Sequence, residues 1–127
     1  MAFDYDQLVE AYKHPRHRGK ITGGLHGSAA NVSCGDNISL HLAVDRHGTV
    51  IDAKHEGHGC ALSVAAAEAL CGYAIGKKLS RLCALDYDGL THVLGFTPSA
   101  GRVGCVMVVL SSLKAVCERG IKKRLHK

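Results

Sequence analysis

The feature that most constrains the fold of this 127-residue chain is a short segment with an apolar residue at every second position, followed by a tight turn. Apolar side chains stand at every second position of residues 38–44, and Asp45–Gly48 follows with a glycine suited to positive φ. Successive side chains of a strand point to opposite faces, so this pattern predicts a strand with one buried face and a hairpin turn. We place the returning strand at residues 49–55.

Helical patterns flank this hairpin on both sides. A short helix is predicted over residues 4–13, and Pro15 stops it because proline disfavours helical backbone in the residue before it. After the hairpin, residues 61–75 form an Ala-rich run with apolar side chains at helical spacing. Gly76 then provides a C-terminal stop for this helix.

The remaining segments complete an α+β pattern. Residues 79–95 have room for one or two short helices, and residues 105–120 predict an amphipathic helix that a glycine ends. Residues 19–27 are glycine-rich and predict a loop or a loosely held edge segment. Strands and helices do not alternate as βαβ units, and no linker interrupts the chain, so we expect a single α+β domain over residues 1–127.

Composition and charge indicate the cellular compartment and the classes of partner to expect. No run reaches the ~20 apolar residues that cross a bilayer, and the acidic start of the chain is unlike a secretory signal, so we expect a cytoplasmic protein without membrane contact. The formal net charge is +5. Basic clusters at residues 13–20 and 122–127 contribute to it, but they lack the interleaved aromatic residues that stack on bases, so we expect no nucleic-acid partner.

The chain has six cysteines, and three of them lie within predicted helices or helical connections. In a reducing compartment an even number of cysteines does not indicate disulfides. Apolar neighbours surround Cys71, Cys83 and Cys117, so we expect these three to be small buried side chains.

The other three cysteines, Cys34, Cys60 and Cys105, each lie beside glycine at a predicted boundary. Glycine lets the backbone bend so that a thiol can project with room for a ligand. Cys60 and Cys105 fall in the first turns of predicted helices, where the helix dipole favours thiolate. Asp36 adds a hard oxygen close to Cys34. Three thiolates and a carboxylate suit a tetrahedral zinc site or the anchoring of an iron–sulfur cluster.

Five motifs in a fixed order make the chain resemble one family over nearly its whole length. In this combination it is similar to the IscU/SufU/NifU N-terminal family of iron–sulfur cluster assembly scaffolds. The motifs are Tyr12-x-x-Pro15-Arg16, Asn31-x-Ser33-Cys34-Gly35-Asp36, Asp52-Ala53-Lys54, Gly57-x-Gly59-Cys60-Ala61-x-Ser63 and Arg102-x-x-Cys105.

The resemblance implies a three-stranded antiparallel sheet packed by helices, and a scaffold rather than an enzyme. Such a scaffold builds a transient 2Fe–2S cluster from iron and the sulfur of a cysteine desulfurase, and transfers it to acceptor apoproteins. By position, Cys34, Asp36, Cys60 and Cys105 would hold the cluster. Asp36 would keep it labile, because a hard oxygen binds soft metal centres less firmly than sulfur does.

The chain mixes features of two branches of this family. Gly104 stands where IscU proteins carry a histidine, and Arg102-x-x-Cys105 is similar to SufU. The short separation of Cys60 and Cys105 is IscU-like. The alternative function is therefore a zinc-dependent sulfurtransferase, with zinc in the cluster-free form. The persulfide acceptor would be Cys105 in the IscU pattern, or Cys34 in the SufU pattern.

The missing histidine leaves the fourth ligand open. Asp36 closes the set without a new partner, and His58, in the turn before Cys60, is a candidate additional ligand because imidazole binds both zinc and iron. His55 is expected to be a packed ring. An incomplete ligand set also suits a homodimer that shares a cluster.

Overall fold

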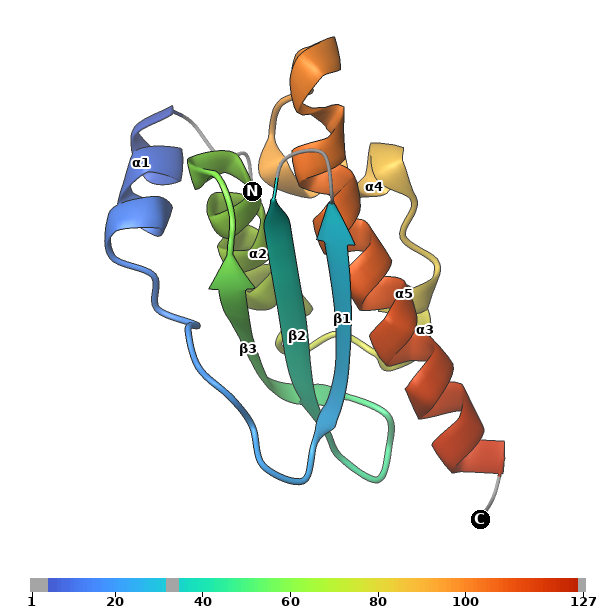
Figure 1. Ribbon diagram of the computed structural model, residues 1–127. Coiled ribbons are helices and arrows are strands. Elements are labelled where there is room, and N and C mark those ends of the chain that lie inside the picture. Colours follow the sequence, from blue (N-terminus) through green and yellow to red (C-terminus); the bar gives the residue numbers. More distant parts are fainter. Residues whose placement is uncertain (1–4, 32–34, 126–127) are drawn as a thin grey trace.

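Three antiparallel strands form the centre of the fold. The computed structural model describes residues 5–31 and 35–125. Strands β1 (Leu25–Asn31), β2 (Asp36–Val44) and β3 (Val50–His58) lie in the order β1-β2-β3 (Figure 1). The hairpin predicted from the alternating pattern is confirmed, since the strands on either side of the turn pair as expected and Gly48 in the turn has φ of 84°.

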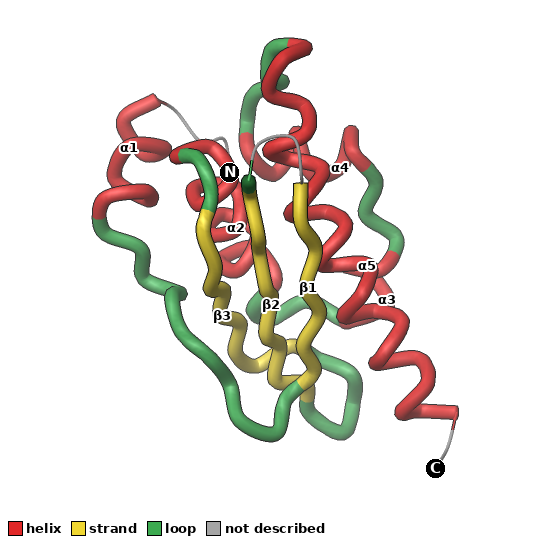
Figure 2. Tube along the Cα trace, in the orientation of Figure 1, coloured by secondary structure: helices red, strands yellow, loops and turns green. Residues whose placement is uncertain are grey.

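Helices cover one face of this sheet. Helix α2 (Ala61–Ala74) packs on β3, and α5 (Val103–Leu125) packs on β1 and β2. Figure 2 shows both helices behind the strands and α1 (Tyr5–Lys13) beside them. The short helices α3 (Leu79–Cys83) and α4 (Tyr87–Leu94) and the 3₁₀ turn η1 (Ala100–Arg102) connect α2 to α5. The predicted α+β class and the helix-packed antiparallel sheet are confirmed.

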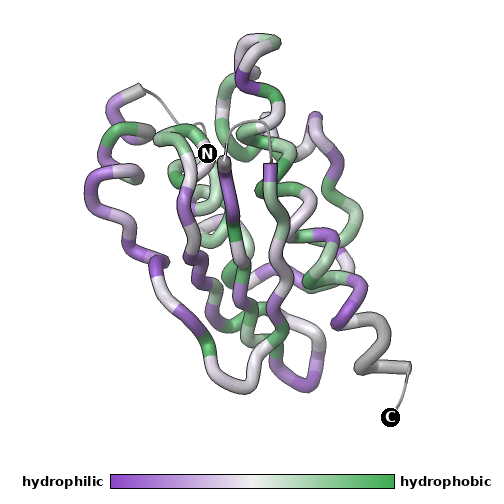
Figure 3. Tube along the Cα trace, in the orientation of Figure 1, coloured by the Kyte–Doolittle hydropathy of each residue, from purple (hydrophilic) through white to green (hydrophobic). Residues whose placement is uncertain are grey.

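The core lies between the sheet and the two long helices. The alternating residues Ile38, Leu40 and Leu42 are each 2% exposed or less, as the period of two requires. They belong to the same buried cluster as Val106 and Val109 of α5, which are fully buried. Figure 3 shows hydrophobic residues along α2 and α5, and hydrophilic residues in the segment that precedes β1.

Strand β1 is an edge strand that begins within a segment expected to be a loop or an edge segment. The glycine-rich stretch 19–27 was expected to be a loop or an edge segment, and the edge strand begins at Leu25 and continues to Asn31. A side chain at Gly27 would place its Cβ 2.5 Å from the backbone nitrogen of Val116. Glycine is therefore required where α5 crosses β1, and the strand carries no alternation of large apolar residues that could have predicted it.

Helix α5 also continues beyond its expected end. Gly120 was predicted to end the helix, but the helix extends to Leu125. A Cβ at Gly120 would lie 2.7 Å from Cδ2 of Leu79 and 3.1 Å from Cδ1 of Leu25. This glycine provides space for side chains of neighbouring elements, and it does not act as a helix stop.

The expectation that no segment is long enough to cross a membrane was also wrong by length and composition. Residues Ala100–Gly120 form a helical stretch that meets both criteria, and half of its apolar window is buried inside the protein. The core helix of a soluble protein has the same character, and α5 supplies much of the core here.

One pair of cysteines is bonded, contrary to the expectation of plain buried thiols. Cys83 at the end of α3 and Cys117 of α5 form a disulfide with a Cα–Cα distance of 5.6 Å. Beside it, the Lys114 ammonium donates to the Cys83 carbonyl oxygen at 2.7 Å. Cys71 fits the expectation: it is a free thiol, 1% exposed, and burial raises its pKa well above the usual range.

His55 is a packed ring, as predicted. It is 1% exposed, and its Nε2 lies 2.9 Å from Glu68 Oε1 in α2. Glu68 also accepts the backbone N–H groups of Arg16 at 2.7 Å and His17 at 3.0 Å. Burial raises the pKa of Glu68, but the hydrogen bonds from His55, Arg16 and His17 outweigh burial and leave this pKa below its usual value. The network attaches the segment after α1 to β3 and α2.

Candidate metal centre

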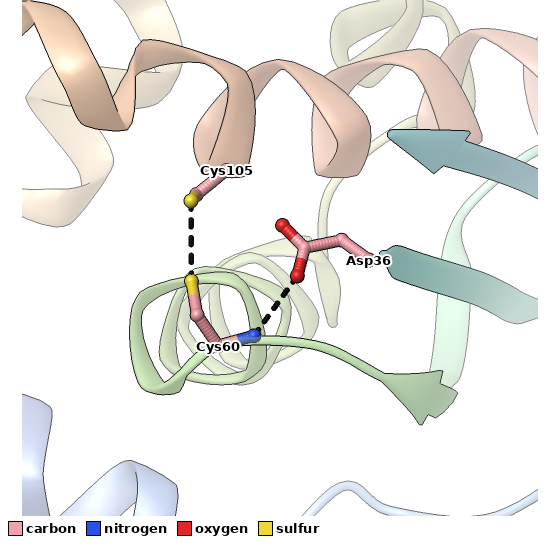
Figure 4. A group of neighbouring side chains, drawn as sticks. All are labelled: Asp36, Cys60 and Cys105. Atoms are coloured by element: carbon pink, nitrogen blue, oxygen red, sulfur yellow. Dashed lines mark hydrogen bonds between the residues drawn. The ribbon is translucent and has the colours of Figure 1, made fainter. Parts of the chain in front are cut away.

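The ends of three elements meet at one end of the sheet. Asp36 is the first residue of β2, Cys60 is the N-cap residue of α2, and Cys105 lies in the first turn of α5 (Figure 4). One oxygen or sulfur atom from each of the three lies within 4.8 Å of the others. Asp36 and Cys105 are buried, at 2% and 3% exposure, and Cys60 is half-buried. The fold thus brings together residues that are far apart in sequence.

The Asp36 carboxylate binds the start of α2. Its Oδ1 accepts the backbone N–H of Cys60 at 2.9 Å, and its Oδ2 accepts the Ser63 hydroxyl at 2.8 Å. Cys60 makes no side-chain cap of its own. A helix begins with N–H groups that lack partners, so the carboxylate of β2 acts as the cap and places negative charge at the positive end of the helix dipole.

Ser63 is a site residue to which the sequence analysis assigned no role. It is fully buried, and besides its bond to Asp36 it lies 3.4 Å from Cys60 Sγ. Its place in the first turn of α2, three residues after Cys60, is the signal that points to it. Residues three apart on a helix lie on the same face.

Gly59 leaves the space that this arrangement needs. A Cβ at Gly59 would lie 3.0 Å from Asp36 Oδ1 and 3.0 Å from Ser63 Cβ. Two residues earlier, Gly57 has φ of 129°, and a Cβ there would lie 1.9 Å from the carbonyl oxygen of Asn37. Glycine is needed at Gly57, and at Gly59 a larger residue would press on the Asp36 and Ser63 side chains where β3 turns into α2.

The two described thiols of the site differ in acidity. Their Sγ atoms lie 3.1 Å apart, within hydrogen-bond distance. Burial raises the pKa of Cys60, but hydrogen bonds from Ser63 and Cys105 outweigh it and lower this pKa below the usual value. Burial, followed by the hydrogen bond and charge of Cys60, raises the pKa of Cys105 to about 12. Cys60 is therefore the thiol that ionises first and then accepts a hydrogen bond from Cys105.

The donor set fits a transition metal. Thiolates suit zinc and iron–sulfur clusters, and the carboxylate is a hard donor that both zinc and iron accept. Asp36 is already held by two hydrogen bonds, which orient its oxygens as outer-shell partners orient the ligands of a metal site.

Two further ligands were predicted, Cys34 and His58. Cys34 lies outside the described residues, so its role stays a prediction. His58 is exposed at the end of β3 and pairs with Asn37. Directly paired residues share a face of the sheet, and Asn37 neighbours Asp36 on the strand, so His58 lies on the face opposite Asp36. Arg102, before the start of α5, is exposed.

The protein is thus an α+β domain in which a carboxylate and two thiols at one end of an antiparallel sheet form a candidate metal centre. Residues 4–124 match the NifU-like N-terminal domain, and the chain belongs to that family. This finding confirms the IscU/SufU/NifU resemblance inferred from the motifs.

Several characterised proteins are similar in sequence. The chain is 27% identical over 122 residues to the iron–sulfur cluster assembly enzyme IscU of Drosophila melanogaster, covering 91% of this chain and 76% of that protein. It is 26% identical over 117 residues to the scaffold protein IscU of Haemophilus influenzae, covering 87% and 89%. It is also 34% identical over 73 residues to the zinc-dependent sulfurtransferase SufU of Bacillus subtilis, covering 57% and 48%.

Solved structures agree with the fold. The NifU-like N-terminal protein of Brucella abortus has a TM-score of 0.73 at 17% identity, with 92% of each chain covered. A putative scaffold protein for the SUF system from Fervidobacterium islandicum has a TM-score of 0.69 at 24% identity, covering 86% of this chain and 93% of that one. At these identities the likeness concerns the fold alone.

Proposed function

We propose that this protein is a cytoplasmic scaffold on which a 2Fe–2S cluster is assembled and then transferred to acceptor apoproteins. The observation that carries the proposal is the convergence of Asp36, Cys60 and Cys105 on one partly exposed site. In this role Cys34 completes the thiolate set, and a cysteine desulfurase supplies the sulfur. Relatives named as iron–sulfur cluster assembly scaffolds support the proposal.

The residues of the site suit temporary binding of iron and sulfide as cargo. Cys60, half-exposed and the more acidic thiol, offers the first thiolate. Asp36 supplies a weaker, oxygen donor from the floor of the site. Cys105 loses its proton with more difficulty, so its ligation depends on the positive charge of the incoming iron.

Sulfur would arrive as a persulfide. A scaffold thiolate attacks the outer sulfur of the desulfurase persulfide, a new S–S bond forms on the scaffold, and the desulfurase cysteine leaves as thiolate. We propose Cys105 as the acceptor in the IscU pattern, or Cys34 in the SufU pattern. Because Cys105 is buried and its pKa is raised, it must lose its proton before it can attack, so we expect it to be a slower acceptor than an exposed thiol.

A second candidate function is that of a zinc-dependent sulfurtransferase. The same thiolates and carboxylate fit zinc, and the chain is similar to a protein with that activity. In this role zinc would be held in the cluster-free form by Asp36, Cys60, Cys105 and Cys34.

A homodimer that shares a cluster between two such sites would be a further arrangement of the scaffold.

Anaerobic reconstitution separates the two functions. The protein is incubated with ferrous iron, cysteine, a cysteine desulfurase and a dithiol reductant, which reduces persulfide sulfur to sulfide, and iron, zinc and sulfide are quantified per chain. A visible cluster chromophore that is lost in Cys60→Ser and kept in the Cys71→Ala control supports the scaffold. Tightly held zinc, no chromophore and faster desulfurase turnover would reject the scaffold in favour of the sulfurtransferase.

A further inference from the structure

The Asn31 side chain occupies the space that a side chain at Gly104 would need, beside the candidate metal centre. Gly104 immediately precedes Cys105 in the first turn of α5. A Cβ at Gly104 would lie 2.6 Å from Nδ2 of Asn31 and 3.6 Å from its Cγ. Two groups this close cannot both keep their places, so a side chain at position 104 would require the Asn31 amide to shift.

The strand pairing explains why Asn31 reaches this place. Asn31 is the last residue of β1, and its direct partner across the sheet is Asp36. Direct partners of an antiparallel pair project from the same face, so Asn31 lies on the face from which the Asp36 carboxylate enters the site. This end of the sheet therefore contributes two neighbouring polar side chains to the first turn of α5.

The Asn31 amide has hydrogen-bonding capacity left for a ligand. It is half-buried, and within residues 5–31 and 35–125 its side chain has no hydrogen-bond partner. A primary amide carries two N–H donors, and a thiolate or bound sulfide is an acceptor that offers no donor in return. An amide is also neutral over the whole physiological pH range, so it adds a donor without adding a proton that can be lost.

We propose that Asn31 donates an N–H hydrogen bond to the sulfur held at Cys105, and that Gly104 is the residue that gives the amide access to it. The inference rests on the proposed function, in which Cys60 and Cys105 bind metal through their sulfur atoms. A hydrogen bond to a thiolate withdraws electron density from the sulfur and stabilises its charge, which tunes the bound metal centre.

Because the two positions share one space, the effects of substitutions at Asn31 and Gly104 should be coupled. A methyl group at Gly104 would push the Asn31 amide aside, because the end of an asparagine side chain moves more easily than backbone. Gly104→Ala should therefore have the same effect as Asn31→Ala. The double variant should be no worse than either single variant, since the amide can be lost only once.

Cobalt binding tests this coupling, because Co²⁺ reports thiolate ligation through its sulfur-to-metal absorption band. The unmodified protein, Asn31→Ala, Gly104→Ala and the double variant are titrated with Co²⁺ anaerobically in competition with a chelator. We expect both single variants to bind about five-fold more weakly, as for the loss of one hydrogen bond, with the band moved to lower energy. Asn37→Ala, an exposed asparagine on the other face of β2, is the matched control and should leave both readouts unchanged.

Three outcomes would overturn the inference. They are an Asn31→Ala variant with the affinity and the band of the unmodified protein, a Gly104→Ala variant without effect, and single effects that add in the double variant. Thermal unfolding of the metal-free variants checks that all are folded. Absence of a thiolate band in the unmodified protein would overturn the proposed function as well. A normal band in the unmodified protein, with affinity and band unchanged in Asn31→Ala, would overturn this inference alone.

Discussion

The carboxylate of Asp36 accepts the backbone N–H of Cys60 at 2.9 Å, across 24 residues of sequence. One buried side chain thus caps helix α2 and also stands among the candidate metal donors. The stability of the first turn of α2 and the geometry of the site therefore depend on the same carboxylate.

Replacement of Asp36 should destabilise the metal-free fold. In Asp36→Ala, the Cys60 N–H and the Ser63 hydroxyl lose their acceptor in a buried place, which costs about 1–3 kcal/mol. Asp36→Asn keeps one acceptor oxygen and should cost less. Urea unfolding measures both, with the exposed Asp88→Asn as control. An alanine variant no less stable than that control would show that Asp36 does not hold the helix start.

Cysteine labelling should follow the two pKa shifts of the site. Because the pKa of Cys60 is lowered and that of Cys105 is raised to about 12, iodoacetamide should modify Cys60 at lower pH than Cys105 in the metal-free protein. Mass spectrometry of the labelled peptides at a series of pH values gives both profiles.

Two buried serines provide a matched pair for the labelling experiment. Ser63→Ala removes a hydrogen bond to Cys60 and should shift the Cys60 profile to higher pH. Ser112→Ala removes an equally buried hydroxyl that donates to the Val109 carbonyl oxygen, so it should leave the profile in place. Equal shifts in the two variants would contradict a direct role for Ser63.

Glu68 should make the stability of the fold pH-dependent. Its pKa is lower in the folded protein than in the unfolded chain, so its contribution is complete above the unfolded value, ~4.3, and is lost as pH falls through the folded value. Glu68→Gln should cost about 1–3 kcal/mol at pH 7, because hydrogen bonds to a charged group are replaced by neutral ones. The difference from the unmodified protein should shrink in strongly acidic solution.

Chemical unfolding across this pH range measures the Glu68 effect. Glu118→Gln on the exposed side of α5 is the control, and it should change stability little at any pH. A Glu68→Gln deficit that stays constant from neutral to strongly acidic pH would assign the loss to packing and not to charge.

Two glycine-to-alanine variants should change the stability of the protein in opposite directions. Gly27→Ala forces a Cβ to within 2.5 Å of the Val116 backbone nitrogen and should destabilise the protein by about 1–3 kcal/mol or more, with α5 displaced from β1. Gly72→Ala, at an exposed position of α2, meets only ordinary contact at 3.7 Å from His17 Nε2. It should stabilise by about 0.5–1 kcal/mol through helix propensity. Thermal unfolding distinguishes them, and a neutral Gly27→Ala would refute the close crossing of α5 over β1.

Local periodicity determined most of the secondary structure. The alternation at residues 38–44 predicts β2 because each apolar side chain of a half-buried strand must face the core, and this rule acts within the strand itself. The same is true of α2 and of most of α5, whose apolar residues recur at helical spacing. The motifs around Cys60 and Cys105, together with Asp36, likewise identified the family and three residues that the fold brings together.

The tertiary structure alone decided the features that depend on neighbours distant in the chain. Strand β1 has no alternation, because at Gly27 it makes room for α5. The Cys83–Cys117 bond joins α3 to α5, and nothing near either cysteine in the sequence marks the other. His58 and Asp36 are both polar residues at strand ends, yet the register of β2 and β3 puts them on opposite faces. A residue's own segment encodes which of its sides is buried, but what covers that side is determined only when the elements pack.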